Sequence, residues 1–79
     1  MLTVKILGPN YANCQWLETV VRQVVAERGL VAEIEQITSY PEIMRWPVVA
    51  TPGLVINDRL VVSGRIPSAD EIASWLSRN

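Results

Sequence analysis

The spacing of apolar residues changes twice within the first 37 positions, and this change is the strongest constraint on the fold. Residues 2–6 alternate between apolar and polar, as in a strand with one buried face. Apolar residues then recur at three- and four-residue steps, which only a helix aligns on one face: Cys14, Leu17, Val20, Val21, Val24 and Val25. Residues 31–37 return to alternation. Because a helix joins the two strands, we expect a right-handed crossover and a parallel pair.

The segment after this unit predicts one short helix. Ser39 is a typical helix cap, Pro41 suits a first turn, and Glu42 has the spacing of a capping box with Ser39. Pro47 blocks helical geometry, so the helix is expected to end before it.

The last third of the chain predicts a hairpin followed by a helix. Residues 54–56 and 60–62 are β-rich runs, and the turn residues 57–59 between them favour an antiparallel hairpin. Ser68 and Glu71 have the spacing of a second capping box. The inner face of the final helix is expected to consist of Ile72, Ala73, Trp75 and Leu76.

These elements have the order β-α-β-α-β-β-α, which predicts an α/β fold with a four-stranded mixed sheet. The two hairpin strands carry apolar side chains toward both faces, so helices are expected on both sides of the sheet. With 79 residues and no linker, the chain predicts a single domain over residues 1–79.

Charge and composition argue against several classes of function. Seven basic and eight acidic residues give a formal charge of -1 without a basic stripe, so no nucleic-acid partner is expected. One cysteine and no histidine leave no typical set of metal ligands, and we expect neither a metal nor a cofactor. No signal peptide is recognised, and no apolar run approaches the about 20 residues that span a bilayer. We therefore expect a cytoplasmic protein without membrane insertion.

The only cysteine, Cys14, stands where the first strand passes into the first helix. Tyr11 stands three residues before it, at the distance that separates the two thiols of a Cys-x-x-Cys pair. A phenol, with a pKa of about 10, neither attacks a disulfide nor resolves a mixed one. The chain therefore has one thiol where disulfide exchange within one protein needs two.

Three stretches resemble the thioredoxin fold in its minimal, glutaredoxin-sized form, and in particular the small thioredoxin-like family called redox-active disulfide proteins. Residues 6–14 are similar to the active-site loop of that family, residues 50–56 to its Thr-Pro loop and third strand, and residues 63–68 to the segment before its last helix. The resemblance covers nearly the whole chain and implies the thiol-disulfide oxidoreductase class.

The resemblance also implies roles for four residues. It implies that the bond between Thr51 and Pro52 is cis and faces the start of the first helix, and that the backbone of Thr51 is offered to an extended peptide or to glutathione. Cys14 keeps the position of the second, resolving cysteine. Tyr11 holds the position of the nucleophile, so the dithiol motif is degenerate and lacks the usual nucleophilic cysteine.

Each conspicuous residue has two interpretations. Cys14 is either a thiol that forms mixed disulfides or a small buried apolar residue on the helix face. Tyr11 is either a polar anchor at a ligand site or an aromatic that closes the loop. Trp16 and Trp46 are either part of an exposed contact patch or peripheral packing.

Three functions are compatible with these residues. The first is single-thiol exchange through Cys14 with a protein or a glutathione-type thiol partner. The second is a non-catalytic binding module, in which the Thr51–Pro52 loop pairs with an extended peptide and Tyr11 and Trp16 contact its side chains. The third is a homodimer joined through an exposed Cys14, which the reducing cytosol disfavours.

Overall fold

The computed structural model describes residues 2–8, 12–48 and 50–77. Its elements follow in the order predicted from the sequence. They are β1 (Leu2–Leu7), α1 (Ala12–Glu27), β2 (Ala32–Ile37), α2 (Tyr40–Ile43), β3 (Gly53–Ile56), β4 (Arg59–Ser63) and α3 (Ala69–Ser77). Within the described residues, no helix combines the length and the apolar character that a membrane span requires.

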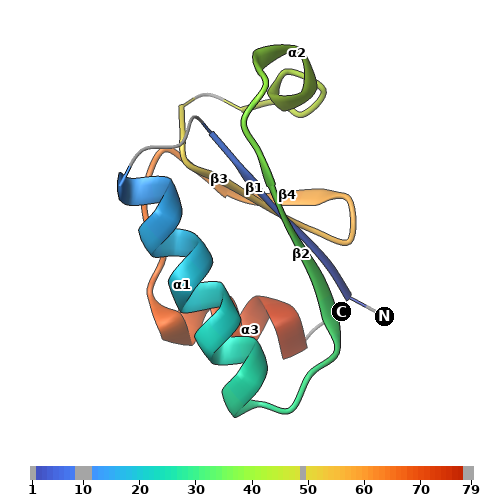
Figure 1. The fold of residues 1–79 in the computed structure, drawn as a ribbon, viewed down its shortest axis with the longest axis vertical. Helices are drawn as coiled ribbons and strands as arrows, with labels where there is room; N and C mark the ends of the chain where they lie inside the picture. Colours follow the sequence, from blue (N-terminus) through green and yellow to red (C-terminus); the bar gives the residue numbers. More distant parts are fainter. Residues whose placement is uncertain (1, 9–11, 49, 78–79) are drawn as a thin grey trace.

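The strands form one mixed sheet in the order β2-β1-β3-β4 (Figure 1). Strands β1 and β2 are parallel, with Leu2 opposite Ala32 and Leu7 opposite Ile37. Strand β3 is antiparallel to both β1 and β4. The predicted parallel first pair and antiparallel hairpin are therefore confirmed. The long connection through α1 permits the parallel pair, and the tight turn imposes the antiparallel one.

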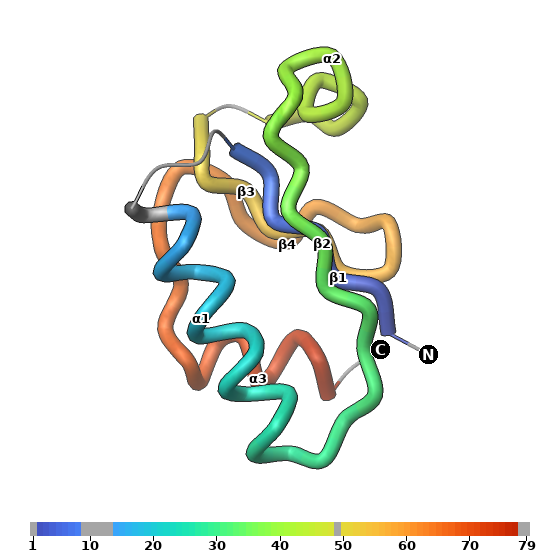
Figure 2. Tube along the Cα trace, in the orientation of Figure 1, coloured from blue at the N-terminus to red at the C-terminus, as the bar shows by residue number. Residues whose placement is uncertain are grey.

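The larger core lies between one face of the sheet and helices α1 and α3, which lie side by side on that face (Figures 1 and 2). We call it the helical-face core. Its buried residues are Leu2, Val4, Ile6, Cys14, Leu17, Val21, Val24, Leu54, Ile56, Val62, Ile72, Ala73 and Leu76. The apolar spacing of both helices therefore predicted the faces that they bury.

The opposite face has a smaller core at one end, which we call the α2-face core. Leu7, Ile37 and Val55 of the strands are buried there together with Ile43 of α2. Partly buried residues pack around it: Trp46, Val48 and Leu60. Helix α2 is only four residues long and lies where β1 and β2 end (Figure 1), so it covers the end of this face and not its length.

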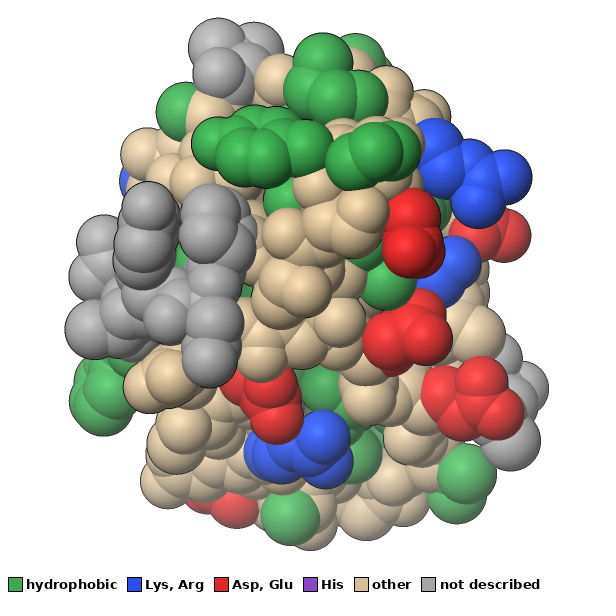
Figure 3. Space-filling model, turned by 45° about the horizontal axis from the view of Figure 1, so that its top comes forward, with side chains coloured by type: hydrophobic (Ala, Val, Ile, Leu, Met, Phe, Trp, Pro, Cys, Tyr) green, Lys and Arg blue, Asp and Glu red, His purple; other side chains and the backbone are tan. Residues whose placement is uncertain are grey.

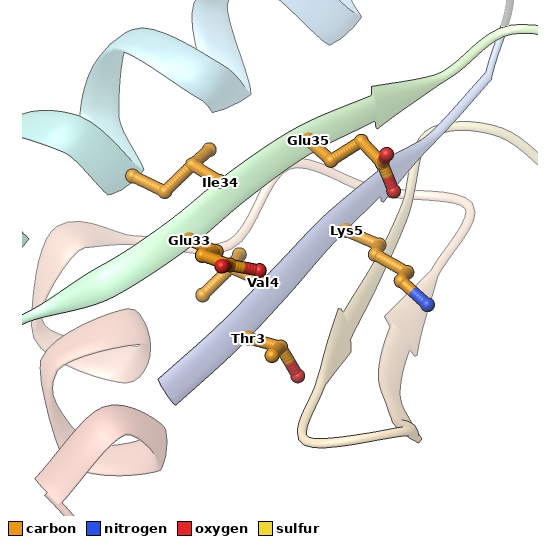
Figure 4. A pocket seen from close by; sticks show the side chains of 6 residues that line it. All are labelled: Thr3, Val4, Lys5, Glu33, Ile34 and Glu35. Atoms are coloured by element: carbon orange, nitrogen blue, oxygen red, sulfur yellow. The ribbon is translucent and has the colours of Figure 1, made fainter. Parts of the chain in front are cut away.

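The rest of that face carries polar side chains along β1 and β2. Thr3 and Lys5 lie opposite Glu33 and Glu35 in the parallel pairing. Figure 4 shows Thr3, Lys5 and Glu35 extending away from α1, whereas Ile34 points toward it. A pocket of about 560 Å³ follows these two strands. This polar stretch is on the side of the sheet opposite to Cys14, which belongs to the helical-face core.

Two helix boundaries form as predicted. Gly29 follows α1 with a φ of 63°, a conformation that glycine adopts without a steric cost. At the start of α3, the Glu71 N–H donates to the Ser68 Oγ at 3.2 Å, and the Ser68 N–H donates to the Glu71 Oε1 at 3.1 Å. The capping box predicted at Ser68 and Glu71 is therefore confirmed.

The capping box predicted at the start of α2 is wrong. Ser39 is the N-cap residue, but its side chain makes no capping hydrogen bond. Pro41, the second residue of α2, has no N–H, so only the N–H of the third residue, Glu42, is left as a donor to a cap side chain. Pro41 does lie in the first turn as predicted.

The hairpin is tighter than the sequence predicted. Asn57 and Asp58 form its turn with φ values of 49° and 66°, while Arg59, predicted in the loop, is the first residue of β4. Asn57 also joins the hairpin to β1. The Thr3 N–H donates to Asn57 Oδ1 at 3.0 Å, and the Asn57 N–H donates to the Thr3 carbonyl at 2.9 Å.

Candidate functional site

Gly8 is the point at which the end of β1, the first turn of α1 and the loop before β3 meet. A Cβ atom on Gly8 would lie 2.6 Å from the Sγ of Cys14 and 3.2 Å from the Cβ of Thr51. The φ of Gly8 is 152°, in a region that residues with side chains rarely adopt. The missing side chain therefore lets Cys14 and Thr51 approach the same backbone position.

Backbone hydrogen bonds hold the neighbouring segments in place. The Gly8 N–H donates to the Ile37 carbonyl at 2.9 Å, which extends the contact between β1 and β2 beyond the strands. The Gly64 N–H donates to the Pro52 carbonyl at 3.0 Å. The loop that contains Pro52 is thus attached to the segment after β4, while Gly53, which follows it, pairs with Leu7 of β1.

The Thr51–Pro52 dipeptide combines a buried and an exposed residue. The peptide bond between them is cis. Pro52 is buried, whereas Thr51 is exposed. Thr51 therefore presents a surface beside Gly8 and Cys14 while the residue after it is fixed in the interior.

Cys14 lies in the first turn of α1 and is only 1% exposed. Its neighbours in the helical-face core include Leu17 and Val21, one and two turns further along the same helix face. The start of a helix favours negative charge, whereas apolar surroundings disfavour it. The burial agrees with the interpretation of Cys14 as a small apolar residue, and a reactive thiol at this position needs local opening to be reached.

The aromatic residues near the site differ in exposure. Tyr11 lies outside the described residues, so its predicted place beside Cys14 stays a prediction. Trp16 is 59% exposed on α1, as its position off the apolar stripe predicted. Trp46 and Trp75 are partly buried and pack against the α2-face core and the helical-face core, respectively. Trp16 is therefore the tryptophan that is accessible to a partner.

A pocket that the sequence analysis missed is also bounded by Thr51. It has a volume of about 380 Å³, and its lining residues are Tyr40, Ile43, Met44, Val48, Ala50 and Thr51. Tyr40 and Met44 are 67% and 65% exposed despite their large apolar side chains. Their four-residue spacing around α2 was the available signal, because it places both on one side of a helix turn. Hydrophobic side chains gather at the end of the molecule that carries α2 (Figure 3).

An ion pair stabilises the segment that leads into α3. Arg65 Nη1 donates to Glu71 Oε1 at 3.0 Å, and Nη2 donates to Oε2 at 2.7 Å. The hydrogen bond from Arg65, followed by that from the Ser68 backbone, lowers the pKa of Glu71 to about 2. Gly64, the residue before Arg65, donates the hydrogen bond to the Pro52 carbonyl, so the ion pair begins one residue after the attachment of the Thr51–Pro52 loop.

The sheet order, the two packed helices and the Thr51–Pro52 loop beside the start of α1 together define a thioredoxin fold. Solved structures agree. The germline-specific thioredoxin Deadhead of Drosophila melanogaster is similar with a TM-score of 0.68 and 17% identity, over 98% of this chain and 79% of that chain. Glutaredoxin 1 from Francisella tularensis is similar with a TM-score of 0.52 and 17% identity, over the full length of both chains.

The family is shown by sequence. The family described as thioredoxin domain matches residues 2–77. A thioredoxin from Methanothermobacter thermautotrophicus is 39% identical over 77 residues, which cover 98% of this chain and 100% of that protein. The chain therefore belongs to the thioredoxin family and to the thiol-disulfide redox class.

Proposed function

We propose that this protein exchanges disulfides through the single thiol of Cys14. The Cys14 thiolate attacks one sulfur of a partner disulfide, a mixed disulfide forms, and the second partner sulfur leaves as a thiolate. The chain has no other cysteine, so an outside thiolate must attack the partner's sulfur in the mixed disulfide. That step joins the outside thiol to the partner and releases Cys14 as a thiolate.

The observation that supports this proposal is the shared contact at Gly8. Cys14 Sγ and Thr51 both lie close to the position where a Gly8 side chain would be. Thr51 is exposed, so a partner that lies against its backbone comes near the sulfur. In this arrangement Thr51 holds an extended partner, Pro52 fixes the loop, and Trp16 and Tyr11 contact the partner's side chains.

The burial of Cys14 determines how the exchange proceeds. Because Cys14 is only 1% exposed, its thiol reacts when the start of α1 opens locally, and helix ends open at a lower free energy than the whole domain. We place the reaction in the cytoplasm, where glutathione and protein thiols supply the outside thiol.

The proposal is tested by incubating the native protein with glutathione disulfide and, separately, with a peptide disulfide, followed by intact mass spectrometry. We expect one adduct per chain, its removal by added thiol, and no adduct on the Cys14→Ser variant. Circular dichroism of both proteins establishes that they are folded. If native Cys14 forms no adduct with either disulfide, while the urea-unfolded protein does, the single-thiol function is wrong.

A second experiment tests the positions assigned to Tyr11 and Cys14. The Tyr11→Cys variant restores a Cys-x-x-Cys pair, and we expect it to form a disulfide that dithiothreitol reduces. The measurement is the loss of two protons' mass on oxidation and the loss of thiol titre. Wild-type protein treated in the same way is the control. A variant that stays fully reduced under oxidising conditions would contradict the assignment of both positions.

A further inference from the structure

We infer that the free edge of β2 binds an extended segment of a partner protein in which lysine or arginine alternates with apolar residues. The segment adds a strand to the four-stranded sheet beside β2, which is the outermost strand on its side. Unpaired backbone groups at a sheet edge are a template for such an addition. We call this surface the β2 edge, and it consists of residues Ala32–Ile37. The inference does not depend on exchange at Cys14.

Two hydrogen bonds show which backbone groups of β2 face outward. The Leu2 N–H donates to the Val31 carbonyl at 3.3 Å, and the Gly8 N–H donates to the Ile37 carbonyl at 2.9 Å. The pairing between them is continuous, and backbone groups alternate in direction along a strand, so the odd-numbered residues of β2 all face β1. The N–H and C=O groups of the even-numbered residues 32, 34 and 36 therefore point to the free edge.

Glu33 and Glu35 make one side of the β2 edge negative. Both are exposed, and they lie opposite Thr3 and Lys5 on the polar face of the sheet. The Nζ of Lys5 lies 3.8 Å from Asp58 Oδ1, and among residues 2–8, 12–48 and 50–77 neither Glu33 nor Glu35 takes part in an ion pair. Basic residues at every second position of an added strand have the same spacing as these two carboxylates and face them across the new pair.

The two sides of the β2 edge differ in the side chains that they accept. Ile34 points toward α1 (Figure 4) and is only partly buried against the helical-face core, so apolar side chains of an added strand can pack beside it. On the glutamate side, the pocket of about 560 Å³ along β1 and β2 leaves room for long basic side chains. A strand with basic residues on one side and apolar residues on the other therefore matches both.

The charges argue against a second copy of this chain as the occupant. An antiparallel pair of two β2 edges centred on Ile34 would place each Glu33 opposite a Glu35. Like charges directly opposite each other destabilise a strand pair. The same two residues that attract a basic segment thus prevent the edge from pairing with itself.

The experiment uses a short peptide of alternating lysine and valine with blocked ends. Two matched peptides carry glutamate in place of lysine, or the same residues in an order without alternation. Binding to the wild-type protein is measured by isothermal titration calorimetry at low salt. We expect the alternating lysine peptide to bind at least about tenfold more tightly than either matched peptide. No binding of the alternating lysine peptide, or equal binding of all three, would overturn the inference.

A pair of double variants separates the β2 edge from a general attraction of opposite charges. Glu33→Gln with Glu35→Gln removes two charges from the edge, and Glu27→Gln with Asp70→Asn removes two exposed charges from the helices. We expect the first pair to weaken binding about tenfold and the second by less than about twofold. Equal weakening by both would show that the peptide recognises net charge and not this edge.

Hydrogen exchange of single amides, followed by NMR, tests whether the peptide pairs as a strand. In the free protein we expect the outward N–H groups of Ile34 and Gln36 to exchange faster than those of Glu33 and Glu35, which are bonded to β1. The bound peptide should slow the exchange of Ile34 and Gln36 about tenfold or more. Binding that leaves both amides unprotected would contradict strand addition.

The Cys14→Ser variant separates this inference from the proposed function. We expect it to bind the alternating lysine peptide as the wild type does, although it forms no disulfide adducts. A β2 edge that binds in a protein whose native Cys14 proves unreactive would refute exchange and support the edge. Loss of peptide binding in Cys14→Ser, with circular dichroism unchanged, would overturn the assignment of the peptide to β2.

Discussion

The two faces of the sheet differ in how completely they are covered. The helical-face core is covered along its length by α1 and α3 and contains most of the fully buried side chains. The α2-face core occupies one end of the opposite face, and the remainder of that face is polar. Buried apolar area is the main source of stability. The helical face therefore contributes most to the stability of the fold, whereas the α2 end of the molecule leaves the apolar side chains of Tyr40 and Met44 exposed.

The candidate site lies where these two faces meet. Cys14 belongs to the helical-face core, while Ile43 of the α2-face core lines the pocket of about 380 Å³ beside α2. Thr51 lines this pocket and also lies beside Gly8, next to the sulfur of Cys14. Cys14 is therefore buried in the more completely covered core, while Tyr40 and Met44 are exposed beside the less completely covered one.

The largest effect on stability is expected from replacing one buried side chain of each core with alanine, which compares the two cores directly. Leu17→Ala removes a fully buried side chain from the helical-face core, and Ile43→Ala removes one from beneath the short helix α2. We expect the first to lower the free energy of unfolding by about 4 kcal/mol and the second by about 2 kcal/mol, because the site under α2 can collapse or admit water. Urea denaturation monitored by circular dichroism measures both. Equal losses would mean that α2 is as tightly packed as α1.

The boundary between the faces is tested next by Gly8→Ala. The new Cβ would meet Cys14 Sγ at 2.6 Å and Thr51 Cβ at 3.2 Å, and the backbone φ would be strained. We expect a loss of about 2 to 3 kcal/mol in the free energy of unfolding. Gly29→Ala is the control, because φ there is also positive but nothing lies within 4 Å of the new Cβ. Its loss is expected to be about 1 kcal/mol.

The contact with the sulfur is isolated by combining Gly8→Ala with Cys14→Ala. If the new Cβ crowds the Cys14 Sγ, the free energy of unfolding of the double variant falls by about 1 kcal/mol less than the sum of the two single losses. Strict additivity would show that Cys14 does not press on this position and that Gly8→Ala acts through backbone strain and the contact with Thr51.

The fold was predictable because its signals are local and repeat along each element. The alternation in β1 and the helical spacing from Cys14 to Val25 both identified the buried faces. The turn at Asn57 and the capping box at Ser68 depend on residues close together in the chain. Such features follow from backbone chemistry and need no knowledge of tertiary packing.

The candidate site was predictable only in part, because its geometry depends on long-range contacts. The family resemblance implied that the Thr51–Pro52 loop faces the start of α1, and the structure puts Thr51 and Cys14 next to Gly8. The approach at Gly8 has no local sequence pattern, and the pocket beside α2 has only the four-residue spacing of Tyr40 and Met44. The capping box predicted at Ser39 was wrong although its residues have the expected spacing, since the Ser39 side chain makes no capping hydrogen bond.

A smaller effect on stability is expected from a change of pH, through Glu71 on the helical side of the molecule. The pKa of Glu71 is lowered from its ordinary value of 4.5 to about 2 by Arg65 and Ser68. A lowered pKa in the folded protein means that ionised Glu71 favours folding above pH 4.5. This contribution is lost as the pH falls from 4.5 toward 2, where folded Glu71 becomes protonated.

The Glu71→Gln variant tests this contribution. We expect it to have a lower melting temperature than wild type at pH 7 and a difference that narrows steadily between pH 4.5 and pH 2. Glu27→Gln, at the end of α1 and exposed, is the matched control, with an expected difference close to zero at every pH. A Glu71→Gln difference that stays constant over this range would exclude the ion pair and capping bond as its cause.

The smallest effect on stability is expected from substitutions in the polar stretch along β1 and β2, on the face of the sheet that carries α2. Lys5 Nζ lies 3.8 Å from Asp58 Oδ1 and 5.2 Å from the centre of the Trp46 ring. Asp58 is largely exposed, so water and salt screen this pair, and exposed pairs contribute about 0 to 1 kcal/mol. The contact with Trp46 adds about 0.5 kcal/mol at an exposed site. Lys5→Met keeps an unbranched side chain of similar length and removes the charge.

We therefore expect Lys5→Met to change the free energy of unfolding by less than about 1 kcal/mol and Asp58→Asn by less than about 0.5 kcal/mol, both measured in urea at low and high salt. High salt should reduce the difference between Lys5→Met and wild type, because the Asp58 contribution is screened while the packing of the side chain on Trp46 is retained. A loss above 2 kcal/mol for Lys5→Met would contradict the comparison of the two faces, because it would make this polar stretch as important to folding as the core beneath α2.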